Sequence, residues 1–198
     1  MKRFVVLITC CAAALAAIPP VGASAISQHR AQAQSEGSEI SVAEFAARFG
    51  PKDPMARARI LTWGFAIRNR HSGKCLDADP GQSWDGGRVY LWDCNGADWQ
   101  KWIALLQDGR WAFGAYDGRV LDAVLNNTNG SAITRYRWRG WSDGGSWNQQ
   151  WYFEPTGEIK NAWNLRCLDG DPAQAGSNPQ RTWLWDCNGT DWQKWDLV

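Results

Sequence analysis

An eleven-residue sequence that occurs twice is the feature that most constrains the fold of this chain. Residues 92–102 read WDCNGADWQKW and residues 185–195 read WDCNGTDWQKW, so ten of the eleven positions are identical. Both copies end in Gln-x-Trp, and a third such triplet lies between them, at residues 149–151. The first Gln of the triplets stands at positions 100, 149 and 193, in steps of 49 and 44 residues. Repetition at such a period indicates a repeat architecture.

A second set of markers recurs in step with the triplets. Cys-Leu-Asp occurs at residues 75–77 and 167–169, and Val-Leu-Asp occurs at residues 120–122. Between these markers, short apolar or alternating runs are separated by Gly, Asn and Asp turns, and no helical period is sustained. This pattern predicts an all-β domain with many short strands. The markers divide it into three repeats, at about 64–109, 110–156 and 157–198.

The N-terminal residues predict export. Lys2 and Arg3 precede an apolar stretch at residues 4–17, and Ala-Ser-Ala at residues 23–25 has the small side chains of a cleavage site. The apolar stretch is too short to span a membrane as a helix. We therefore expect residues 1–25 to be removed as a signal peptide, and the mature protein to be secreted without membrane insertion.

Residues 26–62 are expected to form a polar leader before the folded domain at 63–198. Residues 26–40 are rich in Gln, Ser and Ala, which is typical of flexible segments. Residues 41–49 combine a Ser-x-x-Glu capping box with apolar residues at helical spacing, so we expect a short amphipathic helix there. Its apolar face would dock either on the domain or on a partner. A basic connector at 51–62 completes the leader.

The charge of the mature protein excludes two classes of partner. The full chain has a formal charge of +1, and the loss of Lys2 and Arg3 leaves about −1. This balance gives no electrostatic footprint for nucleic acid or for an anionic membrane. The 15 tryptophans are the unusual feature of the composition. A core uses some of them, because each buries a large apolar area, and so many predict that several are exposed for recognition.

The four cysteines that follow the signal form two local pairs. Cys75 and Cys94 are 19 residues apart, and Cys167 and Cys187 are 20 residues apart. In an exported protein, an even and regularly spaced set predicts disulfides. Each would stabilise the fold by roughly 3 kcal/mol in the chain-entropy model. A zinc site is the alternative, but it would require Cys-x-x-Cys spacing, which is absent.

The combination of Cys-Leu-Asp, a strand ending in Leu-Trp-x-Cys, and Gln-x-Trp resembles the ricin-type β-trefoil lectins over residues 64–198. The resemblance implies a twelve-stranded β-trefoil with pseudo-threefold symmetry. It also implies that each disulfide closes within its repeat. The tryptophans of the Gln-x-Trp triplets would then be core residues rather than ligand contacts, namely Trp102, Trp151 and Trp195.

The resemblance implies a sugar site on the surface of each repeat. The family uses the Asp of the Cys-x-Asp segment, an aromatic residue two positions before the second cysteine, and an Asn-Gln pair that opens the Gln-x-Trp triplet. An aromatic ring packs against the apolar face of a sugar, and carboxylate and amide groups bond its hydroxyls. The alternative is that each Asp is only a turn residue that bonds its own backbone. The candidates in the outer repeats are Asp77, Trp92, Gln100, Asp169, Trp185 and Gln193.

Both outer repeats depart from the family pattern in the same way. Trp99 and Trp192 occupy the position expected to be Asn. The change removes a polar group and adds a second ring, so we expect an aromatic sandwich around the ligand. Tyr90 and Trp183 lie on the same strand face as the stacking rings, because strand side chains alternate with period two. They extend the expected aromatic surface.

The middle repeat keeps the full polar set, which consists of Asp122, Tyr136, Asn148 and Gln149. Val120 and Trp138 stand at its cysteine positions, so we expect packing to replace the disulfide there. This repeat also has five extra residues between positions 138 and 149. The loop from residue 139 to 147 is expected either to build a pocket or to block one.

The sequence favours a carbohydrate-binding protein without catalytic activity. It has no Gly-x-Ser-x-Gly, His-Glu-x-x-His or phosphate-binding Gly loop, and we expect no metal or cofactor. Our first hypothesis is a secreted lectin whose partners are glycans or glycoconjugates. The alternative is a lectin-like receptor-binding or scaffold subunit of a secreted bacterial toxin, similar to those of the cytolethal distending toxins, which acts through protein contacts. A third is an inert surface module. Trp99 and Trp192 would flank a sugar in a lectin and form an apolar patch in a protein interface.

Overall fold

The computed structural model describes residues 59–141 and 146–198, except for the side chains of residues 59–63. The signal peptide expected at 1–25 and the helix expected at 41–49 lie outside the described residues. Within the described part, strands and single-turn 3₁₀ helices are the regular elements, which confirms the all-β prediction. No helix in this part is long and apolar enough to cross a membrane.

The strands are β1 (Arg59–Phe65), β2 (Ile67–Asn69), β3 (Cys75–Ala78), β4 (Gly87–Trp92), β5 (Trp102–Gln107), β6 (Arg110–Ala115), β7 (Arg119–Ala123), β8 (Ser131–Arg137), β9 (Trp151–Phe153), β10 (Ile159–Asn161), β11 (Cys167–Gly170), β12 (Gln180–Trp185) and β13 (Trp195–Leu197). The 3₁₀ helices are η1 (Pro80–Gln82), η2 (Asp98–Gln100), η3 (Trp147–Gln149), η4 (Pro172–Gln174) and η5 (Asp191–Gln193). Each Gln-x-Trp triplet therefore runs from the end of a 3₁₀ turn into a strand.

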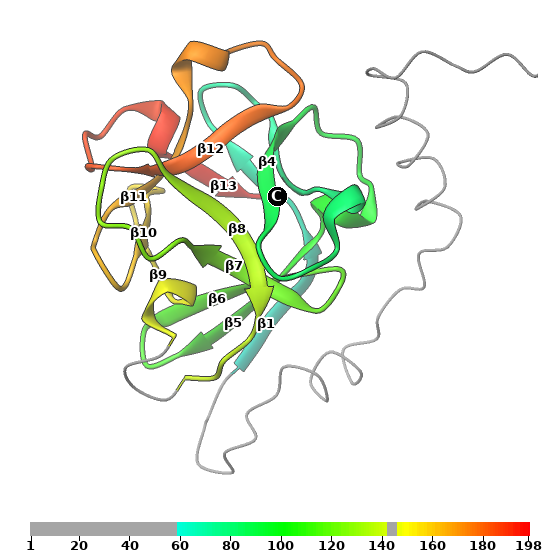
Figure 1. Ribbon diagram of the computed structural model, residues 1–198, viewed down its shortest axis with the longest axis vertical. Coiled ribbons are helices and arrows are strands. Elements are labelled where there is room, and N and C mark those ends of the chain that lie inside the picture. The colour runs from blue at the N-terminus through cyan, green and yellow to red at the C-terminus, as the bar shows by residue number, and fades with distance from the viewer. Residues whose placement is uncertain (1–58, 142–145) are drawn as a thin grey trace, which may run out of the picture.

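The strands pair antiparallel in a threefold pattern. Strands β2 to β5, β6 to β9 and β10 to β13 form the three repeats. The third strands of the repeats, β4, β8 and β12, each pair with the other two (Figure 1). The last strand of each repeat pairs with the first strand of another, as β5 with β6, β9 with β10 and β13 with β2. This arrangement is the predicted β-trefoil.

Strand β1 is an addition to the twelve strands of the repeats. It pairs along β5, from Arg59 opposite Leu106 to Phe65 opposite Trp102. The sheet therefore begins at Arg59, inside the segment expected to be a basic connector. No strand was expected before Trp63, and the pairing partner lies about 40 residues further along the chain.

The Gln-x-Trp tryptophans occupy equivalent places in the core, as the resemblance implied. Trp102, Trp151 and Trp195 are fully buried. Their indole N–H groups donate to the backbone oxygens of the Leu in the three x-Leu-Asp segments, at 3.0, 3.2 and 3.0 Å. Each indole thus ties the last strand of its repeat to the second strand, and the apolar core closes around all three.

The disulfides form as predicted, between Cys75 and Cys94 and between Cys167 and Cys187. In the middle repeat, Val120 lies opposite Tyr136, as Cys75 lies opposite Trp92. Val120 is fully buried. Trp138 packs edge-on against Trp141, with ring centroids 5.1 Å apart, so apolar packing stands where the other repeats have a disulfide.

Polar side chains join each repeat to the next in cyclic order. Asp85, in a loop of the first repeat, accepts hydrogen bonds from Arg119 and Arg137 of the second repeat. Without this carboxylate the two arginines would face each other as like charges, because they are directly opposite in the β7–β8 pair. The two corresponding contacts are those of Asn129 with Asp186 and Arg166, and of Asn178 with Asp93 and Lys74.

Candidate functional site

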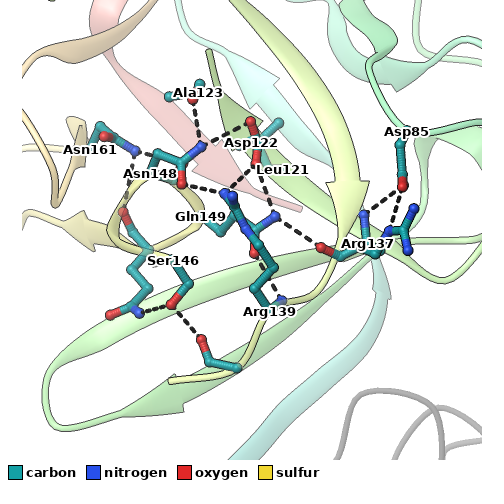
Figure 2. Close-up of polar contacts among 12 residues, drawn as sticks. Asp85, Leu121, Asp122, Ala123, Arg137, Arg139, Ser146, Asn148, Gln149 and Asn161 are labelled. Carbon is teal, nitrogen blue, oxygen red and sulfur yellow. Dashed lines mark hydrogen bonds and ion pairs between the residues drawn. The ribbon is translucent and has the colours of Figure 1, made fainter. Parts of the chain in front are cut away.

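The polar residues predicted for the middle repeat come together where β7 meets η3 (Figure 2). The buried Asp122 carboxylate accepts a hydrogen bond at each oxygen, from Asn148 Nδ2 at 3.0 Å and from Gln149 Nε2 at 2.9 Å. Asn148 also donates to the backbone oxygen of Ala123 at 2.7 Å, and Gln149 to that of Arg137 at 3.0 Å. Both amides are therefore held in a fixed orientation on the carboxylate.

Arg139 completes this cluster, although it was not among the predicted site residues. Its Nη2 donates to Asn148 Oδ1 at 2.6 Å and lies 3.3 Å from Asp122 Oδ2. Its guanidinium carbon is 5.5 Å from the centroid of the Tyr136 ring. The guanidinium thus stands where the carboxylate, the amide and the ring of this repeat converge. The sequence indicated a role for Arg139 only in that it is the first residue of the loop at 139–147.

Burial changes the acid–base behaviour of this site. Loss of solvent is the largest influence on Asp122 and raises its pKa to about 6, against the opposing effects of Gln149, Arg139 and Asn148. The nearby Asp85 carboxylate adds to the increase in this pKa. Asp122 therefore begins to take up a proton in mildly acidic solution.

The first repeat places its candidate residues inside the protein. Asp77 is fully buried and accepts a hydrogen bond from Gln100 Nε2 at 2.9 Å. Trp99 is only 2 % exposed and Tyr90 only 6 %. Trp92 is half-buried and packs against Tyr90, with ring centroids 6.1 Å apart. The second ring expected at Trp99 therefore belongs to the interior, and among the candidate rings of this repeat Trp92 is the one that reaches the surface.

The third repeat repeats the Asp–Gln pair but exposes more aromatic surface. Asp169 accepts a hydrogen bond from Gln193 Nε2 at 2.6 Å, and burial, the largest influence, raises its pKa. Trp183 and Trp185 are half-buried with centroids 5.0 Å apart. Trp192 is stacked at 3.8 Å on His71, which comes from the first repeat. The sequence predicted that Trp192 would form an aromatic sandwich around a ligand. In the structure, the ring that stacks on Trp192 is instead that of His71.

Among the tryptophans whose side chains the structure describes, the most exposed are ones that the sequence did not single out. Trp84, Trp147 and Trp163 are 54, 39 and 38 % exposed. Trp84 follows η1, Trp147 opens η3, and Trp163 lies in the turn between β10 and β11. Their positions confirm that several tryptophans reach the surface. No residue pattern distinguished them, because exposure at a loop depends on how the neighbouring loops fold over it.

Comparison with known proteins agrees with this geometry. Residues 63–195 match the model of the ricin-type beta-trefoil lectin domain. The chain belongs to the ricin-type β-trefoil lectin family. Membership in this family supports carbohydrate binding, and domains of this type are themselves non-catalytic. No curated protein matches the chain in sequence.

Solved structures of similar fold include lectins and enzymes that carry a lectin-like domain. The designed threefold-symmetric protein ThreeFoil is 28 % identical, with a TM-score of 0.61 over 68 % of this chain and 96 % of its own. The exo-β-1,3-galactanase 1,3Gal43A of Clostridium thermocellum is 25 % identical, with a TM-score of 0.60 over 70 % of this chain but only 30 % of its own. The C-half of the earthworm R-type lectin, solved with GalNAc, is 19 % identical, with a TM-score of 0.53 over 67 % of this chain and 95 % of its own.

Proposed function

We propose that this ricin-type domain acts as a secreted lectin, without catalytic activity of its own, and binds glycans through its middle repeat. The observation that carries the proposal is the fixed cluster of Asp122, Asn148 and Gln149 beside Tyr136. The two outer repeats have a tryptophan where this repeat has Asn148. The middle repeat therefore keeps the polar groups that family members use for sugar hydroxyls.

The chemistry of the cluster suits a saccharide. A sugar ring presents an apolar face of C–H groups, which an aromatic ring such as that of Tyr136 can cover. Its hydroxyl groups need donors and acceptors in fixed directions, and a carboxylate held by two amides supplies acceptors with little loss of side-chain entropy on binding. The Gln149 side chain acts here as a positioning group, since it bonds Asp122 and the backbone from a fully buried position.

The outer repeats are proposed as secondary aromatic surfaces. Trp92 and Trp185 are half-buried and leave part of each ring at the surface. A shallow site of this kind binds weakly, because a millimolar Kd corresponds to only about −4 kcal/mol. Several such sites on one domain would recover affinity on dense glycans through avidity.

The proposal requires that the protein is secreted. Two disulfides within the repeats form and persist in an oxidising environment. The expected signal peptide at residues 1–25 would bring the chain to such an environment.

A glycan array with the protein lacking residues 1–25 tests the proposal. Asp122→Asn keeps the size of the side chain but removes its charge, and we expect it to abolish the signal. Asp77→Asn makes the same change in the buried Asp–Gln pair of the first repeat, and we expect it to leave the signal in place. Thermal melts would confirm that both variants are folded.

Two outcomes would contradict the proposal. Loss of the signal with Asp77→Asn but not with Asp122→Asn would place the site in the first repeat. Absence of any reproducible glycan signal from the intact protein would refute the lectin function. The protein-contact alternative, a toxin subunit, would then take its place.

A further inference from the structure

Arg139 has an exact structural counterpart in each of the other repeats. Its backbone N–H donates to Gln149 Oε1 at 3.1 Å. In the first repeat Asn95 makes the same bond to Gln100 at 2.9 Å, and in the third repeat Asn188 makes it to Gln193 at 2.8 Å. The three residues therefore occupy one position of the trefoil.

The side chains at this position behave differently. The Asn95 and Asn188 oxygens turn back to their own loops, where each accepts a hydrogen bond from the backbone N–H two residues later, at 3.0 Å. Arg139 instead extends into the site and bonds Asn148. The position thus holds a short polar residue that caps a turn in the outer repeats, and a long cation that reaches Asn148 and Asp122 in the middle repeat.

A second difference between the repeats is coupled to the first. Asn148 stands where the outer repeats have Trp99 and Trp192. In the middle repeat the two changed positions touch, through the 2.6 Å bond from Arg139 Nη2 to Asn148 Oδ1. Next to the Asp122 carboxylate, an amide and a guanidinium therefore replace an indole.

The hydrogen bonds within this cluster use the amide donors more fully than those of Arg139. The amide N–H groups of Asn148 and Gln149 are used by Asp122 and by backbone oxygens. The Arg139 side chain is 35 % exposed. Among the residues that the structure describes, its hydrogen bonds and ion pair to other side chains use only Nη2. Since a guanidinium has five N–H donors, Nε and Nη1 remain for a ligand.

The surroundings add positive charge. The Arg137 guanidinium carbon lies 5.9 Å from the Tyr136 ring, so two guanidiniums flank this ring. Two separate groups of ion pairs lie in this region. Arg139 pairs with Asp122, and a network of Arg119, Arg135 and Arg137 with Asp85 and Asp117 has an excess of one positive charge.

We propose that Arg139 makes the middle repeat a site for acidic saccharides, with the sugar carboxylate on the guanidinium and the sugar ring against Tyr136. A guanidinium presents paired N–H donors in a planar fork that matches the two oxygens of a carboxylate. The inference rests on the proposed lectin function and narrows it to one ligand class. The competing explanation is that Arg139 is a plug that fills the site.

Isothermal titration of the mature protein with α-1,4-linked trigalacturonate and α-1,4-linked galactotriose separates these explanations. In each residue these two sugars differ only in a carboxylate or a CH₂OH group. We expect trigalacturonate to bind more tightly by roughly tenfold to a hundredfold, the range for a hydrogen bond to a charged group. Arg139→Asn installs the residue of the outer repeats and should remove this preference. Arg68→Asn removes an exposed arginine of β2 and should leave the preference unchanged.

A further variant guards against a folding defect. Arg139→Lys keeps the positive charge beside Asp122 but loses the planar fork. We expect it to melt close to the wild type and to retain only part of the preference for trigalacturonate.

Three results would overturn this inference alone. The first is a gain of galactotriose binding in Arg139→Asn, which would identify Arg139 as a plug. The second is a preference for trigalacturonate that survives Arg139→Asn. The third is a glycan array that shows Asp122-dependent binding of neutral glycans alone, in which case the proposed lectin function would stand. Absence of all glycan binding would refute both proposals.

Discussion

Trp151→Phe tests how much the indole of a Gln-x-Trp triplet contributes to the trefoil core. The change keeps an aromatic ring but removes the N–H that donates to the backbone oxygen of Leu121 at 3.2 Å. Both residues are fully buried, so the oxygen loses this partner at a cost of about 1–3 kcal/mol. The smaller ring also leaves a small cavity, and deletions of that size cost about 1 kcal/mol. We expect the free energy of unfolding to fall by about 2–4 kcal/mol.

Urea denaturation followed by far-UV circular dichroism measures this loss. In a domain of this size it corresponds to a decrease in Tm of about 4 °C for each kcal/mol. The matched control is Trp84→Phe, which changes an indole that is 54 % exposed and should cost less than about 0.5 kcal/mol. A loss below about 1 kcal/mol for Trp151→Phe, or one no larger than that of the control, would refute the role given to this hydrogen bond.

Three further outcomes follow from contacts described above. Replacement of both Cys75 and Cys94 by Ala should lower the free energy of unfolding by roughly 3 kcal/mol, as measured by urea denaturation. The folded pKa of Asp122 lies at about 6, above its ordinary 3.8, so its protonation stabilises the fold at low pH and this contribution is lost as the pH rises from about 4 to 6. Relative to Asp122→Asn, the wild type should therefore lose up to about 3 kcal/mol of stability between pH 4 and 7, and equal slopes for the two proteins would contradict this. Burial raises the pKa of Asp85, but hydrogen bonds from the Arg137 side chain and backbone N–H outweigh it, so the pKa is lowered overall. Ionised Asp85 should therefore stabilise the fold above about pH 4, and this contribution to the free energy of unfolding should be lost in more acidic solution. The Asp85→Asn variant should lack this acid-dependent loss when stability is measured by urea denaturation at each pH.

The fold was predictable because its markers are local and recur at nearly constant spacing. Each Trp of a Gln-x-Trp triplet and each Leu of an x-Leu-Asp segment has a core position that the pattern of its own repeat defines. The pairing of β1 was not predictable in this way. The strand has one charged residue, Arg59, and its pairing partner lies far along the chain, so only the assembled sheet determines its place.

The candidate site was predictable in its polar part alone. Strand and turn geometry brings the Asp and the Gln together in every repeat, and Asn148 follows from its place next to Gln149. The burial of Trp99 depends on whether neighbouring segments close over an indole, which one repeat does not specify. Whether the Arg139 side chain enters the site depends on the rotamer of a long side chain. The family pattern used for the prediction includes no cation at that position.

The cyclic order of the polar contacts between repeats has a consequence for how the domain comes apart. In a linear array of repeats, the two ends each lack a neighbour and can fray before the middle. Here the loop of the third repeat holds the first through Asn178, Asp93 and Lys74. No repeat is terminal in the assembled ring, although two are terminal in the chain. Loss of the polar contacts between any two repeats therefore weakens both of those repeats. The three repeats should unfold together as one cooperative unit.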